Sequence, residues 1–114
     1  MRMPGLAAVL ALPGMAMAGD WQPMTGAAIT EALTGATVIY RGEAPARQVF
    51  HESGRTLYDS GRPDWGTWRI SGDRYCSQWP PAPQWDCYEM TSDGADGIRF
   101  ISEGGTVFEG RIAR

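Results

Sequence analysis

From residue 36 to the C-terminus, apolar and polar residues alternate in short runs that are separated by turn residues. The alternation predicts strands over 36–41, 47–52, 55–59, 66–71, 74–79, 86–91, 97–102 and 106–112. Short strands at near-regular spacing, with Gly-rich breaks, are typical of an antiparallel meander. We therefore expect a mainly β fold, either a small antiparallel meander β-barrel or a strongly curved sheet of about seven to eight strands.

Two hairpins have a register that the pattern can fix, and the first is at 72–73. A two-residue loop there places Ile70 opposite Tyr75. It also places Trp68 opposite Ser77. Trp68, Ile70 and Tyr75 then share one face of the hairpin, which we expect to be a core face.

The last hairpin offers a choice between two loop lengths. A two-residue loop at 104–105 would place Phe100 opposite Glu109, whereas a three-residue loop at 103–105 places it opposite Phe108. A slip of one residue moves every apolar side chain to the other face of a strand. We therefore expect the three-residue loop.

One segment before the strands has the pattern of a short N-terminal helix. Thr25 can cap its start, and Gly35 suits the left-handed position after its end. Ile29, Ala32 and Leu33 lie on one face at helical spacing, so that this face can pack on a sheet.

The first 18 residues have the order of a secretory signal peptide. Arg2 supplies a positive start, Leu6–Leu12 is a short apolar run, and 16–18 form an Ala-x-Ala cleavage site. The apolar run is too short to span a bilayer. We expect export to the periplasm or secretion, with residues 19–114 as a single β-barrel-like domain.

Charge and hydropathy narrow the class of partner. The chain carries 10 basic Lys and Arg residues against 13 Asp and Glu residues, a formal net charge of −3 at pH 7, and its acids are scattered. A surface of this kind does not favour nucleic acid, whose phosphates select basic faces. No stretch after the signal is apolar enough to cross a membrane, so we expect a soluble product.

Two cysteines, Cys76 and Cys87, bracket a Pro-rich loop. In an exported protein two cysteines most often pair, and a pair on neighbouring strands would close the loop at its base. The competing interpretation, a metal site, lacks ligands because the chain has one His and no further Cys. We expect one disulfide.

The loop between the cysteines is the most distinctive candidate surface. Pro80, Pro81 and Pro83 stiffen it, and Trp79 and Trp85 flank them. Exposed Trp beside Pro suits binding to a sugar face, a peptide or a protein. The alternative is that one or both indoles fold back over the open end of the barrel or over the disulfide.

No catalytic constellation stands out. His51 lies in a strand-like run without recognisable partners, and we expect it to be an ordinary strand residue. The segment 93–97 resembles a calcium loop faintly, but it lacks the spaced carboxylates and the distal Glu, which favours a hairpin turn. We therefore assign no catalytic, cofactor-binding or metal-ligating residue.

Four segments of the C-terminal half carry a family resemblance: 66–70, 72–76, 85–88 and 97–100. They resemble an uncharacterised family of small exported alphaproteobacterial proteins. The resemblance implies a disulfide between the two matching cysteines and no catalytic residues. The chain is also loosely similar to calycin-type barrels, including periplasmic protease and lysozyme inhibitors. That likeness is one of architecture, which does not fix function.

Three hypotheses for the function follow from these patterns. The first is a non-catalytic periplasmic binding or inhibitor-like module, whose partner would be an envelope protein or a glycan. The second is a small-ligand carrier with a cavity inside the barrel. The third is an enzyme that acts on an envelope polymer, which would need two convergent carboxylates in a cleft.

The signal pattern generates the first prediction. Cleavage after Ala18 should leave Gly19 as the N-terminus of the exported protein. N-terminal sequencing or the intact mass of protein from the periplasm or medium measures this. Exported protein that retains Met1 would contradict the assignment.

Overall fold

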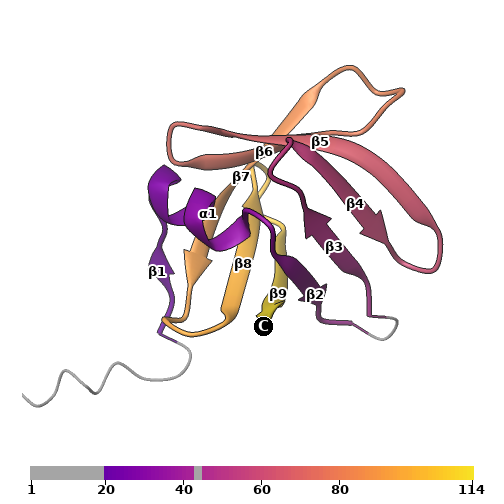
Figure 1. Ribbon diagram of the computed structural model, residues 1–114. Helices are drawn as coiled ribbons and strands as arrows, with labels where there is room; N and C mark the ends of the chain where they lie inside the picture. The colour runs from indigo at the N-terminus through magenta and orange to yellow at the C-terminus, as the bar shows by residue number, and fades with distance from the viewer. Residues whose placement is uncertain (1–19, 43–44) are drawn as a thin grey trace, which may run out of the picture.

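The computed structural model describes residues 20–42 and 45–114 (Figure 1). The expected export signal, residues 1–18, lies outside the described residues. Strands dominate the described chain, and one short helix precedes most of them. The elements are β1 (Gln22–Pro23), α1 (Gly26–Leu33), β2 (Thr37–Tyr40), β3 (Arg47–Phe50), β4 (Arg55–Asp59), β5 (Pro63–Ser71), β6 (Arg74–Gln78), β7 (Trp85–Ser92), β8 (Gly97–Ser102) and β9 (Val107–Ala113).

Strands β2 to β9 form a closed antiparallel barrel of eight strands. Each pairs with the next along the chain, and β9 returns to pair with β2, which closes the sheet. The short β1 lies on the edge of β7 beyond β6, because β6 pairs with 85–88 and β1 with 91–92. The predicted meander barrel with one short helix and one disulfide is confirmed, and closure leaves no long free edge.

Both predicted hairpin registers are confirmed. Ile70 lies opposite Tyr75 across the 72–73 turn, and Phe100 lies opposite Phe108 across the last one. These registers follow from local alternation, because any one-residue slip would have turned the apolar side chains to solvent.

Most strand limits differ from the prediction by one or two residues, and two differences are larger. Strand β5 begins at Pro63 rather than at residue 66, and it pairs from there with Asp59 of β4. Proline is tolerated at the first position of a strand, so the predicted turn at 60–64 is shorter than its composition suggested. Strand β1 was not predicted, since its two residues carry no alternation.

Helix α1 is capped and fixed at its N-terminus. The amide of Ala28 donates to Thr25 Oγ1 at 3.1 Å, so Thr25 is the N-cap, as predicted. The amide of Gly26 donates to Asp73 Oδ1 at 2.8 Å, which ties the helix to the β5–β6 turn. Figure 1 shows α1 beside this turn, and its packing contacts are with β5 and β6.

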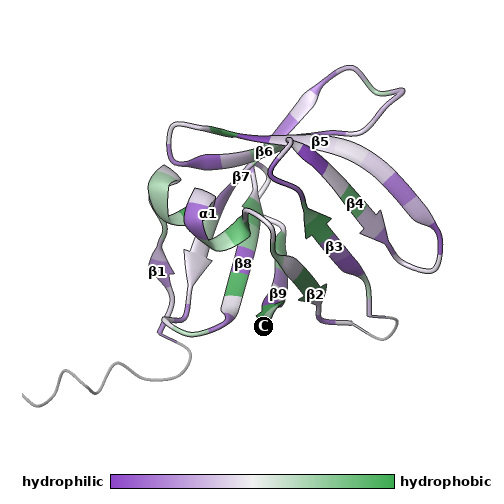
Figure 2. Ribbon diagram, viewed as in Figure 1, coloured by the Kyte–Doolittle hydropathy of each residue, from purple (hydrophilic) through white to green (hydrophobic). Residues whose placement is uncertain are grey.

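The apolar face of α1 closes one end of the barrel. Ile29 and Leu33 are both fully buried, and burial of such a side chain contributes about 1.5–3 kcal/mol. Figure 2 shows apolar residues on α1, β3 and β8. The core cluster comprises Ile29, Leu33, Val38, Phe50, Trp68, Tyr75, Met90, Ile98, Phe100 and Ile112.

The disulfide is the second local constraint that the sequence predicted. Cys76 on β6 lies directly opposite Cys87 on β7, with a Cα–Cα distance of 4.0 Å, and the two are bonded. The bond joins the two strands at the base of the Pro-rich loop. Its confirmed position means that this loop leaves and re-enters the barrel at one fixed point.

Removal of the disulfide should lower the free energy of unfolding. The loop-entropy account assigns about 3 kcal/mol to a closed loop of this length. We expect the Cys76→Ala/Cys87→Ala variant to show that loss in urea denaturation monitored by circular dichroism. Reductant should destabilise the wild-type protein and leave the variant unchanged. An equal response of both proteins to reductant would contradict the prediction.

Candidate functional site

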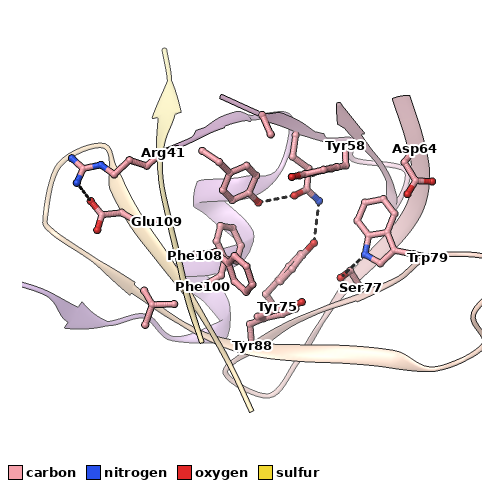
Figure 3. Close-up of a pocket in the computed structure, with 14 residues that line it drawn as sticks. Arg41, Tyr58, Asp64, Tyr75, Ser77, Trp79, Tyr88, Phe100, Phe108 and Glu109 are labelled. Atoms are coloured by element: carbon pink, nitrogen blue, oxygen red, sulfur yellow. Dashed lines mark hydrogen bonds and ion pairs between the residues drawn. The ribbon is translucent and has the colours of Figure 1, made fainter. Parts of the chain in front are cut away.

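A cavity of about 460 Å³ opens at the end of the barrel opposite α1. We call it the mouth cavity. It has the size of ordinary small-molecule sites, which span about 300–1,000 Å³. Side chains from all eight barrel strands and from the residues next to them form its walls (Figure 3). Its aromatic lining residues are Tyr40, Tyr58, Tyr75, Trp79, Tyr88, Phe100 and Phe108.

Trp79 is a fixed wall of the mouth cavity. Its ring lies against Gly66, where an added Cβ would come within 2.6 Å of the indole. Its Nε1 donates to Ser77 Oγ at 3.1 Å. The edge of its ring meets Tyr58, with a centroid distance of 6.3 Å. Contacts on two sides and one hydrogen bond hold the indole in place, so the wall is formed before a ligand arrives.

A hydrogen-bonded glutamine organises the floor of the cavity. Gln48 is 4% exposed. Its Oε1 accepts from the Tyr40 hydroxyl at 2.6 Å. Its Nε2 donates to Thr56 Oγ1 at 2.9 Å and to the Tyr75 hydroxyl at 3.2 Å. Because the amide oxygen and both amide hydrogens are engaged, Gln48 fixes the two phenol rings and keeps no donor for a ligand.

The floor carries no charge at neutral pH. Burial raises the pKa of Tyr75 to about 12, because the phenolate would be poorly solvated there. Burial, together with the neighbouring phenols, also raises the pKa of Tyr40 well above its ordinary value. Both groups are therefore neutral hydroxyls that hydrogen-bond within the floor.

Charged groups lie at the rim, on two sides (Figure 3). On one side Glu109 is paired with Arg41 at 3.3 Å and with Arg99 at 3.1 Å. On the other side is Asp64, which is exposed and lies opposite Tyr58 in the β4–β5 pairing. Within residues 20–42 and 45–114, Asp64 makes no ion pair. It is the uncompensated charge of the described lining.

The structure places the two predicted loop tryptophans on different faces. Trp79 lines the mouth cavity, whereas Trp85 lies outside it, with the guanidinium carbon of Arg69 3.9 Å from its ring centroid. Both side chains are partly buried. A joint role of the two indoles in capturing a partner stays a prediction, but they do not form one continuous surface.

The prolines of the loop lie outside the cavity. Pro80, Pro81 and Pro83 are exposed, and Gln78 Nε2 donates to the Pro83 carbonyl at 2.7 Å. Figure 1 shows this segment projecting from the barrel beyond β6 and β7. The loop therefore extends from the barrel wall and leaves only its first residue, Trp79, in the mouth cavity.

His51 follows the last residue of β3, so it lies just outside the strand in which it was expected. It is exposed, its ring stacks on Trp65 with a centroid distance of 5.8 Å, and its carbonyl accepts from Trp68 Nε1 at 2.9 Å. In the described part of the chain no three His, Cys, Asp or Glu side chains gather as metal ligands would. The position of His51 suits a surface residue whose backbone anchors a core tryptophan.

Apart from Trp79, sequence reasoning did not identify the residues that shape the mouth cavity. Tyr40 and Tyr58 are the last and the next-to-last residues of their strands, and Phe108 is the second residue of β9. In an antiparallel meander those positions meet at one end of the sheet. Aromatic residues recurring at alternating strand ends were the signal that could have located the cavity.

No family model matches the chain, and no match was found among curated proteins or solved structures. The described residues contain no helix with the length and apolarity that a membrane crossing requires. The function is therefore inferred from the site itself, because a barrel fold hosts many activities.

The buried phenols predict a loss of stability at high pH. Tyr75 ionises near pH 10 when unfolded and at about 12 when folded, so proton release favours the unfolded state in that interval. The contribution of Tyr75 to the free energy of unfolding should be complete below about pH 10. It should fall by about 3 kcal/mol as the pH rises to 12.

Urea denaturation at pH 8 and at pH 11 measures this effect. We expect the Tyr75→Phe variant to lose less stability between the two values than the wild-type protein, since Phe cannot ionise. An identical loss in both proteins would show that Tyr75 is not responsible.

Proposed function

We propose that this protein is a non-catalytic carrier that binds a small organic molecule in the mouth cavity. One observation carries the proposal: one end of the barrel is packed by α1 and the apolar core, while the other end keeps a cavity of about 460 Å³ with aromatic walls. Concave, mostly apolar sites with a few fixed polar groups are the usual form of small-molecule sites.

The rigidity of the walls supports binding. Trp79 is held by Gly66, Ser77 and Tyr58, and the floor is held by Gln48. Side chains that are ordered before binding lose little entropy when the ligand arrives. A cavity with fixed walls suits a ligand that is recognised by the faces of aromatic rings, without a loop that has to change conformation on binding.

The arrangement of carboxylates favours binding over polymer cleavage. Glycoside cleavage needs two carboxyl groups that face each other across the substrate. At the mouth, Glu109 is neutralised by Arg41 and Arg99, and Asp64 lies on the other side of the rim. An ion-paired carboxylate is a poor proton donor, so the third hypothesis is the least favoured.

A second candidate is binding of a macromolecule, either an envelope protein or a glycan, as in inhibitor-like barrels. The observation that favours it is the exposed apolar rim: Val107 is 50% exposed and Phe108 46% exposed, both next to the mouth cavity. Under this proposal the rim would contact the partner and the cavity would receive one of its side chains or sugar units.

Export to the periplasm or medium is part of the proposal. The signal pattern of residues 1–18 and the Cys76–Cys87 disulfide support it, because structural disulfides persist in oxidising compartments. A relation to calycin-type barrels is also proposed, and the closed eight-stranded meander with an open mouth supports it.

A neutral fluorescent probe, N-phenyl-1-naphthylamine, tests the carrier hypothesis. We expect its emission to rise on binding to the wild-type protein. The Trp79→Leu variant should bind it about 3- to 10-fold more weakly, because one aromatic face is lost. The matched Trp85→Leu variant changes the other end of the same loop and should bind like the wild-type protein.

The thermal midpoint of each variant, followed by circular dichroism, separates folding from binding. Failure of the folded wild-type protein to bind the probe would refute a general apolar carrier. Equal weakening by both substitutions would show that the mouth cavity is not the site.

A further inference from the structure

We propose that the ligand of the mouth cavity carries a positive charge, as an organic ammonium group held between ring faces and Asp64. The inference rests on the proposed carrier function and names the chemical class of the ligand. Ring faces carry the negative part of the aromatic quadrupole and attract cations, most strongly where water is excluded.

The pairing of the tryptophans is the first support. Three of them carry an arginine guanidinium over the ring, with carbon-to-centroid distances of 3.9 Å on Trp21, 4.4 Å on Trp65 and 3.9 Å on Trp85. Trp68 is buried in the core. Trp79 lines the open space of the mouth cavity, and among the described residues no guanidinium lies over its ring.

The rings around this open space form a partial cage. Tyr58 lies between Tyr40 and Trp79, with centroid distances of 6.0 Å and 6.3 Å, and the planes are tilted by 53° and 77°. At these separations Tyr58 packs against both of its neighbours, and all three rings line the open space of the mouth cavity. An ammonium group in such a cage contacts several ring faces at once, and aromatic cages bind quaternary ammonium ions on this principle.

The charged side chains at the rim bear on the sign of the charge that a ligand carries. On one side of the rim, Arg41 is engaged by Glu109. Asp64, on the side of Trp79 and Tyr58, makes no ion pair there and supplies a counter-charge for a cation (Figure 3).

Two probes of equal shape test the sign of the charge. Phenyltrimethylammonium is a cation, and tert-butylbenzene is its neutral isostere. We expect the wild-type protein to bind the cation about tenfold more tightly, as measured by quenching of tryptophan fluorescence. The advantage of the cation should shrink at high salt, because the Asp64 contribution is screened.

Charge-removing variants locate the effect. Asp64→Asn should weaken binding of the cation about three- to fivefold, the range of an exposed ion pair, and leave binding of the isostere unchanged. Glu89→Gln removes an equal charge from an exposed position on β7 outside the cavity and should change neither affinity. This control excludes a general effect of net charge.

The outcomes separate the two proposals. Equal or tighter binding of tert-butylbenzene, or an Asp64→Asn variant that binds the cation like the wild-type protein, would overturn the cationic ligand and leave the carrier intact. If the two compounds and the neutral naphthylamine probe all fail to bind, the carrier function falls and the cationic ligand falls with it.

Discussion

The packing of three aromatic rings across the middle of the barrel is the contact on which the rest of the structure depends. Phe50, Tyr75 and Phe100 come from β3, β6 and β8, and their centroids lie 5.2–6.4 Å apart. Phe50 is fully buried, and the other two are each 3% exposed. Aromatic pairs at these distances contribute about 0.5–1.5 kcal/mol each beyond their burial. This layer separates a packed half of the barrel from an open half.

The residues on each side of this aromatic layer explain why one half of the barrel is packed and the other is open. On one side α1 supplies Ile29 and Leu33, which complete an apolar core that the strands alone would leave open. On the other side Tyr75 presents its hydroxyl to Gln48, and no further helix covers the rings within the described residues. Since a buried hydroxyl needs a partner, the Gln48 network is the condition for placing phenols at the floor of a cavity.

The features that the sequence predicted are local ones. The Thr25 cap, the registers around 72–73 and 103–105 and the pairing of Cys76 with Cys87 each depend on residues close together in the chain. Closure of the barrel depends on β2 meeting β9, which alternation does not specify. Aromatic residues at strand ends could have indicated where the cavity lies, but not that it is open, because a tyrosine at a strand end suits a packed core and an open wall equally well.

Trp79 shows why the site could be found only in part. Its place beside the prolines marked it as unusual, but the face on which its ring lies depends on Gly66 of another strand. That glycine leaves room for the indole inside the mouth, whereas Trp85 follows the opposite face of the strand pair and meets Arg69. Composition thus identified the loop, and the small residue facing it decided which of its two tryptophans belongs to the cavity. The same geometry leaves the Trp79 ring without the guanidinium that the outer tryptophans have, so an aromatic surface of the same chemistry remains available to a ligand.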